Sequence, residues 1–122
     1  IDEGIELLLK TGKEKADSVR SVSLATKHPY KMWKIDSGFL RPLFSEADGI
    51  KEPYNAPRQI LPKIYQNNGA MNAFWPETIL EKKSMTGDRV LALSMEDWES
   101  INIDSELDFF AAEYIMHKRR EV

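Results

Sequence analysis

Apolar residues recur at helical spacing at both ends of the chain. We expect a first helix that ends near Thr11 and Gly12, because glycine commonly follows the last turn of a helix. A last helix should begin just after Asp104 and Ser105. The apolar stripes expected to face a core are formed by Ile1, Ile5, Leu8 and Leu9 in the first helix, and by Leu107, Phe110, Ala111, Tyr114 and Ile115 in the last.

Between these helices, shorter apolar runs predict strands and one further helix. Residues 19–26 predict a strand that leads into a loop, and residues 32–36 and 38–44 predict a hairpin. Residues 69–74 predict a strand, Pro76 suits the first position of a short helix, and residues 90–95 (VLALSM) predict a buried strand. Residues 46–55 are polar and predict a protruding arm. Strands that alternate with helices indicate an α/β layer fold.

The composition narrows the class of protein. A chain of 122 residues, with 42% hydrophobic and 30% charged residues, forms a single domain. Its net charge is −3 and both signs are interspersed, which argues against a nucleic-acid partner. With no cysteine and two histidines, disulfides, thiol nucleophiles and a three-histidine zinc site are excluded. No apolar run is long enough to span a bilayer, so we expect a cytoplasmic protein without a membrane partner.

The expected first helix starts on Ile1, with no residue before it to act as a cap. Asp2 and Glu3 suit its first turn, because acidic side chains interact favourably with the positive end of a helix. A helix that starts uncapped on the first residue is typical of a cut inside a larger protein. We therefore expect the chain to be a fragment, with an intact short protein as the alternative.

Residues 56–73 (APRQILPKIYQNNGAMNA) combine features of a pocket wall. Arg58 and Gln59 stand between Pro57 and Pro62, which stiffen the backbone on both sides of a guanidinium that can grip a carboxylate through two bonds. An Asn-Gly-Ala turn follows and opens an apolar run. This combination favours a site for an anion and a sugar-like polyol. The alternatives are a surface arginine in an irregular arm and a plain Asn-Gly turn.

Residues 27–31 (KHPYK) form a second candidate segment. Lys31 follows a proline that fixes the local backbone, and its amine can reach a carboxylate or phosphate as a point charge. A solvated loop lysine is the alternative, and without other information it is favoured. His28 has no obvious nucleophile or carboxylate partner in the sequence, so we expect a loop residue that contacts backbone. His117 should lie on the surface of the last helix.

Asn102, Ile103 and Asp104 form a third candidate. An extended backbone places the two oxygen-bearing side chains on one side, just before a helix, where they suit a hard cation such as Mg²⁺ together with substrate phosphates. The alternative is that Asp104 or Ser105 is the N-cap of the last helix, and the spacing alone favours the cap.

Taken in order, KHPYK, PRQILPKIYQNNGAMNA and INIDSELDFFAAE resemble the C-terminal half of the acylneuraminate cytidylyltransferases, the CMP–sialic acid synthetase family. The resemblance covers residues 19–113. It implies transfer of CMP from CTP to an acidic nine-carbon sugar, sialic acid or a related nonulosonate, with release of pyrophosphate. It also implies the C-terminal part of a Rossmann-like nucleotidyltransferase sheet, and a homodimer in which residues 38–55 form the dimerisation arm.

The resemblance also implies roles for individual residues. Asp104 matches the second aspartate of the family's Asp-Ile-Asp, which serves Mg²⁺ and the phosphates, and Asn102 stands where the family has the first aspartate. Arg58 and Lys31 match residues that bind the acidic sugar. The implied substrate-binding set is Lys31, Arg58, Gln59, Gln66, Asn68, Gly69, Ala70 and Asn72.

Three departures from the family pattern affect these expectations. Asn102 removes one carboxylate from the metal pair, Gln66 replaces an arginine of some members, and Asn72 replaces a frequent tyrosine. The family's glycine- and lysine-bearing nucleotide loop has no counterpart here, so we expect the fragment alone to be inactive. The alternative is a non-catalytic module that mainly dimerises or binds an acidic sugar.

Overall fold

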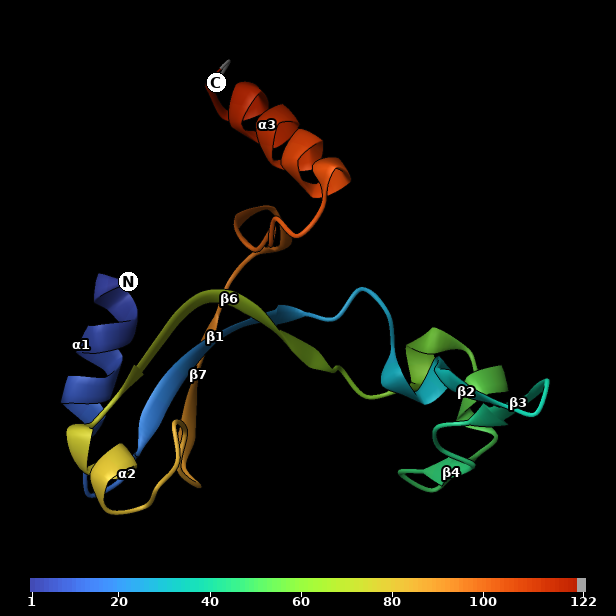
Figure 1. Cartoon of the computed structure of the whole chain (residues 1–122), viewed down its shortest axis with the longest axis horizontal. Helices are drawn as coiled ribbons and strands as arrows, with labels where there is room; N and C mark the ends of the chain where they lie inside the picture. The colour runs from blue at the N-terminus through green and yellow to red at the C-terminus, as the bar shows by residue number, and fades with distance from the viewer. Residues whose placement is uncertain (121–122) are drawn as a thin grey trace. The chain divides into compact units, whose positions relative to one another are not determined.

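Contacts within the chain divide it into two units, each described here by itself. The sheet unit comprises Ile1–Ser23 and the chain from Gln66 onward, and the hairpin unit comprises Leu24–Tyr65. The computed structural model describes residues 1–120 (Figure 1). Helices and strands occur together along the chain, which confirms the expected mixed α/β class. Residues 38–55 lie in the hairpin unit.

A mixed three-stranded sheet forms the centre of the sheet unit. Its order is β6 (Tyr65–Phe74), β1 (Ser18–Leu24) and β7 (Val90–Ser94). β1 and β7 run parallel, with Ser18 opposite Val90. β6 runs the other way, because Trp75 bonds to Asp17 and Met71 bonds to Ser21, so that residue numbers fall along one strand as they rise along the other.

The first helix, α1 (Asp2–Thr11), forms as expected and ends at Gly12, which has a φ of 84°. The predicted buried face was correct at Leu8 and wrong at three other positions. Ile1, Ile5 and Leu9 are 79%, 41% and 60% exposed. The buried residues are Gly4 and Leu8, because α1 approaches the sheet so closely that a Cβ on Gly4 would lie 2.6 Å from the sulfur of Met71.

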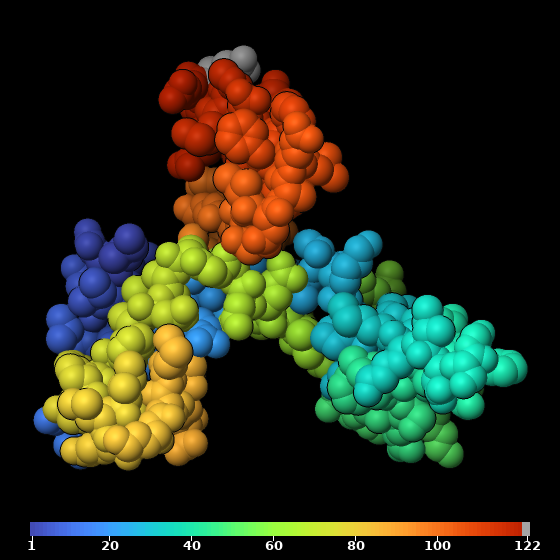
Figure 2. All heavy atoms as spheres, viewed as in Figure 1, coloured from blue at the N-terminus to red at the C-terminus, as the bar shows by residue number. Residues whose placement is uncertain are grey.

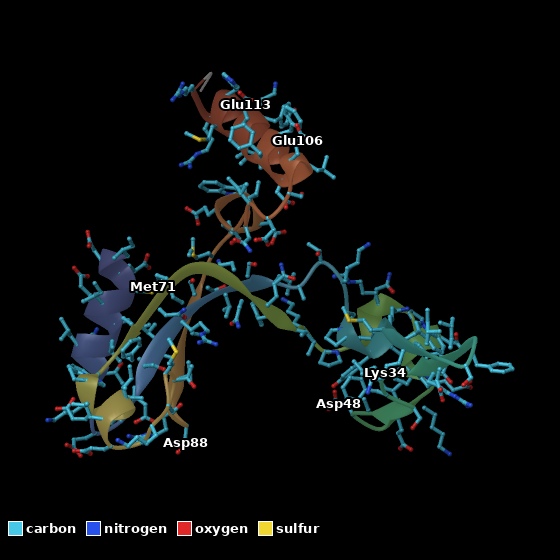
Figure 3. All side chains as sticks on the ribbon, viewed as in Figure 1. Lys34, Asp48, Met71, Asp88, Glu106 and Glu113 are labelled. Atoms are coloured by element: carbon cyan, nitrogen blue, oxygen red, sulfur yellow. The ribbon has the colours of Figure 1, made fainter. Side chains whose placement is uncertain are left out.

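The core of the sheet unit lies between α1 and the sheet. Leu8, Ala16 and Val19 are buried there, and β6 and β7 pack against them through the partly buried Leu7, Met71, Ala73, Trp75, Leu91 and Leu93. Figure 3 marks Met71 where β6 passes α1. β7 is less buried than its apolar sequence predicted. It is an edge strand, its residues alternate between exposed and half-buried, and Val90 is 44% exposed.

Two further helices belong to the sheet unit. α2 (Pro76–Leu80) starts at its proline, as expected. A short 3-10 helix, η4 (Asp97–Glu99), precedes the last helix, α3 (Glu106–Arg120). The existence of α3 confirms the prediction, but its apolar stripe is not covered. Among residues 106–120 none is buried, and the helix is seen uncovered in orange and red in Figure 2.

The hairpin unit contains two small antiparallel hairpins and three 3-10 helices. β2 (Trp33–Asp36) pairs with β3 (Phe39–Pro42) through Ser37 and Gly38, which both have positive φ, and this confirms the predicted hairpin. The arm predicted to follow contains a second hairpin, β4 (Glu46–Ala47) and β5 (Ile50–Lys51). The 3-10 helices are η1 (Pro29–Lys31), η2 (Pro53–Asn55) and η3 (Arg58–Ile60).

Within residues 1–120, no helix combines the length and the apolar character that a bilayer span requires.

Candidate anion-binding site

Lys31 is carried by η1, whose start is fixed by a histidine. His28 is the N-cap, and its Nδ1 accepts a hydrogen bond from the backbone N–H of Tyr30 at 3.2 Å. Pro29 occupies the first helical position, where its fixed φ is compatible with a helix and its missing N–H is not needed. The expectation that His28 contacts backbone is confirmed, because Nε2 also lies 2.9 Å from the carbonyl oxygen of Pro62.

Arg58 opens η3 directly after Pro57, which stands in extended conformation. Its Nη1 donates to the carbonyl of Thr26 at 3.1 Å and its Nη2 to the carbonyl of Ala25 at 2.8 Å. A guanidinium has five N–H donors. The two bonds therefore orient the group and leave the other donors for a ligand.

Lys31 and Arg58 line the same cavity of the hairpin unit. This cationic cavity has a volume of about 340 Å³ and is lined by Thr26, Lys27, His28, Lys31, Met32 and Arg58. The amine of Lys31 donates to the carbonyl of Ala56 at 2.7 Å, so the lysine is held by the segment that precedes Arg58. The two candidate cations, which are distant in sequence, are thus brought together.

No ion pair within residues 1–120 neutralises the charge of the cationic cavity. Within residues 1–120, ion pairs involve the carboxylates of Asp17, Asp36 and Glu77, and none of them pairs with Lys27, Lys31 or Arg58. The residues that line the cavity include no carboxylate. At partly shielded sites, opposite charges about 4 Å apart attract by ~4 kcal/mol before desolvation is counted. The cavity is therefore suited to an anion. Lys27 was not among the predicted site residues, although the basic KHPYK segment contains it.

The two glutamines of the predicted site are both exposed. Gln59 lies in η3 of the hairpin unit, and Gln66 lies near the start of β6. Neither side chain forms a hydrogen bond to any residue between 1 and 120. Both amides are therefore open to solvent.

Asn68 has a different environment, because it is 5% exposed and fully hydrogen-bonded. Its Oδ1 accepts from the Ser21 hydroxyl at 2.6 Å and from the N–H of Ala70 at 3.1 Å. Its Nδ2 donates to the Ser100 hydroxyl at 3.0 Å and contacts the Met95 sulfur at 3.3 Å. The side chain thus joins β6 to β1 and to the segment after β7.

Gly69 and Ala70 form the bend that this asparagine holds. An Asn side chain that accepts from the N–H two residues later mimics a backbone turn, and Gly69 supplies the positive φ of 71°. Met71 then donates its N–H to the Ser21 hydroxyl at 2.9 Å, so the regular backbone pairing is interrupted here. A Cβ on Gly69 would lie 3.7 Å from Oδ1 of Asn102, which brings this bend next to the predicted metal pair.

Asn102 and Asp104 lie together at the surface of the sheet unit. The amide of Asn102 donates to a carboxylate oxygen of Asp104 at 2.7 Å, and both side chains are exposed. Within residues 1–120, no group of three or more His, Asp or Glu side chains is arranged around a common point that could hold a metal ion. The pair offers one carboxylate and one amide oxygen, and Mg²⁺ is commonly bound by one or two carboxylates together with substrate phosphates.

The N-cap of α3 is Ser105 and not Asp104. Ser105 caps α3, because its hydroxyl accepts from the N–H of Asp108 at 3.2 Å while the Asp108 carboxylate accepts from the N–H of Ser105 at 2.9 Å. The Ser105 hydroxyl and the backbone N–H of Asp104 hold the pKa of the Asp108 carboxyl below its usual value. Asp104 contributes only its backbone to the cap, so its carboxylate remains accessible.

Asn72 is paired with a residue that the sequence did not single out. Nε of Arg20, on β1, donates to Oδ1 of Asn72 at 2.8 Å across the β1–β6 pair. No local pattern around Arg20 indicates this contact, because it depends on the register of two strands about fifty residues apart. The predicted residues of the sheet unit are therefore Gln66, Asn68, Gly69, Ala70, Asn72, Asn102 and Asp104, and those of the hairpin unit are Lys31, Arg58 and Gln59.

Asp17 is a buried carboxylate that no pattern in the sequence indicated. It is 3% exposed, and it forms ion pairs with Lys82 at 2.8 Å and Arg89 at 2.9 Å. The hydrogen bond from the Arg89 side chain, followed by that from Lys82, holds the pKa of this carboxyl far below its usual range. The remaining oxygen accepts from the backbone N–H groups of Asp88 and Arg89. These contacts satisfy Asp17 completely, which indicates a structural role.

Comparison with models of known protein families and with curated proteins gave no match for this chain.

Proposed function

We propose that this chain supplies the sugar-acid site and the dimer contacts of a cytoplasmic nucleotidyltransferase. The enzyme would transfer CMP from CTP to sialic acid or a related acidic nonulosonate, and its sheet would be the C-terminal part of a Rossmann-like fold. The observation that carries this proposal is the cationic cavity, where Lys31 and Arg58 meet although they come from two separate motifs. The mixed sheet is consistent with a part of such a fold.

The cavity suggests how the sugar acid would be bound. Arg58 is already oriented by Ala25 and Thr26, so less conformational freedom is lost when its free donors bind a carboxylate. Lys31 is held through Ala56, and its amine retains two further donors. The neutral polyol part of the sugar would need hydrogen-bonding groups, and the exposed amide of Gln59 belongs to the same 3-10 helix as Arg58.

Asp104 and Asn102 are the residues that would hold Mg²⁺. Their exposed oxygens fit an ion that is shared with substrate phosphates, and the hydrogen bond between them would be exchanged for ion contacts. The ion would supply neutralisation of phosphate charge during attack of the sugar hydroxyl on the α-phosphate of CTP. Catalysis would then depend on positioning, without a covalent protein intermediate. Asp104 is accordingly the residue to which we assign the catalytic role.

Binding of sialic acid to the chain tests the sugar site directly. Replacing Arg58 by alanine removes charge-assisted hydrogen bonds worth about 1.5–3 kcal/mol, so we expect the Kd measured by calorimetry to rise roughly 10- to 100-fold. Arg41→Ala is the matched control. Arg41 is exposed, does not line the cavity and makes only a 3.9 Å ion pair with Asp36. Equal Kd values for the wild type and Arg58→Ala would remove Arg58 from the site.

Pyrophosphate release tests the catalytic part of the proposal. The full product of the reading frame that encodes this chain should release pyrophosphate from CTP with Mg²⁺ and an acidic nonulosonate, whereas we expect the chain alone to be inactive. In the active protein, Arg58→Ala should raise the KM for the sugar far more than the KM for CTP. No release with any acidic nonulosonate would refute the enzymatic function.

A second candidate function is a non-catalytic module that dimerises. The favouring observation is the β2–β3 hairpin, where Ile35 and Leu40 lie opposite each other and are 79% and 59% exposed. Exposed apolar side chains grouped on one face are typical of interaction surfaces. A module of this kind would associate in solution and bind no CTP.

A further inference from the structure

We propose that His28 is a positioning residue of the cationic cavity, and that its hydrogen bond to Pro62 holds the Lys31 segment against the Arg58 segment. This inference rests on the proposed function, because it explains how the two cations that would bind the sugar acid are kept together. His28 lines the cavity but is not among the residues that the family resemblance assigns to the substrate.

The imidazole is the most deeply placed polar group of the cavity. His28 is 8% exposed, whereas Arg58 is exposed and Lys31 is half-buried. Its ring stacks obliquely on Tyr30, with ring centroids 4.7 Å apart, and Tyr30 in turn contacts Phe44 at 5.1 Å. A side chain packed in this way has few alternative rotamers, so it can hold a fixed distance between the groups on either side of it.

Both ring nitrogens are used, which determines the tautomer. Nδ1 accepts from the N–H of Tyr30, so the proton of a neutral imidazole must be on Nε2. Nε2–H then donates to the carbonyl of Pro62 at 2.9 Å. Nδ1 thus connects the ring to η1, and Nε2 connects it to the chain that follows η3.

The two bonds connect the segments that carry the cations. Lys31 ends the 3-10 helix that His28 caps, and Pro62 follows shortly after the helix that Arg58 opens. Other links run from the Lys31 amine to Ala56 and from the Arg58 guanidinium to Ala25 and Thr26, but they use the flexible side chains that must themselves respond to a ligand. The His28–Pro62 bond is independent of both cations. Its loss would leave their separation less defined, and the cost of ordering them would be added to binding.

Two conservative variants of His28 each remove one of its two hydrogen bonds and keep the other. Asparagine at position 28 places an amide oxygen near the position of Nδ1 and is a good N-cap, but it is too short to reach Pro62. Glutamine places an amide N–H near the position of Nε2, so it can still donate to Pro62 while losing the cap to Tyr30. The positioning role therefore predicts that His28→Gln resembles the wild type and that His28→Asn does not.

The first measurement is the Kd for sialic acid by calorimetry. We expect His28→Asn to raise the Kd about five- to tenfold, the effect of one buried hydrogen bond, and His28→Gln to change it less than about twofold. Tyr30→Phe is the control, because it removes the hydroxyl contact to Asp48 and leaves both ring nitrogens bonded. An equal loss of affinity in the Asn and Gln variants would overturn the proposal.

The second measurement needs no ligand and keeps the proposal testable if the proposed function is wrong. The N–H of Lys31 bonds to His28 and the N–H of Leu61 bonds to Arg58, so amide hydrogen exchange reports the order of each segment. At Leu61 we expect faster exchange in His28→Asn and unchanged exchange in His28→Gln, whereas the Lys31 amide also reports the loss of the η1 cap in His28→Gln. Unchanged exchange at Leu61 in both variants overturns the positioning role, whereas a wild type that does not bind sialic acid refutes the proposed function alone.

Discussion

At the scale of single residues, buried polar side chains define the local geometry of this chain. Asn68 and Asp17 are 5% and 3% exposed, and each uses its polar atoms in bonds that join segments distant in sequence. An unpaired polar group at such a position would lose its hydration without compensation. These bonds therefore constrain how the strands and the neighbouring segments can be placed against each other. The bend at Asn68-Gly69-Ala70 is held by these hydrogen bonds of the buried Asn68 side chain.

Replacing Asn68 by aspartate tests that dependence. The change removes the donor to Ser100 and places a carboxylate next to acceptor atoms in a buried site, so we expect the free energy of unfolding to fall by roughly 2–4 kcal/mol. Urea denaturation measures the change. The adjacent Asn67→Asp adds the same charge at an exposed position and should alter stability by less than about 0.5 kcal/mol. Similar losses in the two variants would show that the added charge, and not the bonds of Asn68, is responsible.

At the scale of helices and strands, the sequence predicted most elements and misjudged which faces are covered. Gly12, Pro76 and the Ser37–Gly38 turn act locally, so their effects on element ends could be predicted. The second hairpin carries a comparable signal in Asp48-Gly49, but its two-residue strands are too short to show the alternation of apolar and polar residues that predicts a strand.

Which face of a helix or strand is buried depends on the elements that pack against it, and the local sequence does not contain that information. The residue of α1 that faces the sheet is Gly4, where an added Cβ would require the Met71 side chain to shift, whereas the apolar spacing predicted Ile1, Ile5 and Leu9. In the candidate site, Arg58 was a candidate from its own motif, whereas Lys31 became one only through the family resemblance, and both line the same cavity. Lys27 and the backbone contacts that hold both cations could not be predicted, since they arise from how the loops fold back on each other.

Gly87, in the loop between α2 and β7, allows the cost of a steric clash to be separated from the cost of a positive φ. Gly87 has a φ of 68°, and a Cβ there would lie 2.5 Å from Cβ of Asp17. Gly12 has a φ of 84° with nothing within 4 Å of such an atom. Gly12→Ala should therefore lose about 1–2 kcal/mol of stability from the backbone alone. Gly87→Ala should lose at least about 2 kcal/mol more, because it also displaces the carboxylate of Asp17 from its partners. Thermal unfolding compares the two, and equal losses would contradict the clash.

For the molecule as a whole, buried apolar surface is scarce. The buried hydrophobic residues among positions 1–120 are Leu8, Ala16, Val19, Ala25 and Leu61. Larger apolar side chains are exposed in both units, such as Ile35 in the hairpin unit and Leu107 on α3, which are 79% and 77% exposed. Since burial of apolar surface is the main favourable term in folding, we expect that association would add to the stability of such a chain. Of the exposed apolar surfaces on the β2–β3 hairpin and on α3, the hairpin is the stronger candidate for association. Its register places Ile35 and Leu40 opposite each other on one face.

We therefore expect the chain to self-associate through the face of the β2–β3 hairpin that carries Ile35 and Leu40, which are directly paired. Ile35→Ser removes apolar contact worth about 2 kcal/mol, so the dissociation constant from sedimentation equilibrium should rise at least roughly tenfold. Phe39→Ser is the matched control, because Phe39 pairs with Asp36 on the opposite face and is also exposed. If Phe39→Ser weakens association equally, the register does not define the surface. If Leu107→Ser weakens it while Ile35→Ser does not, the contact lies on α3.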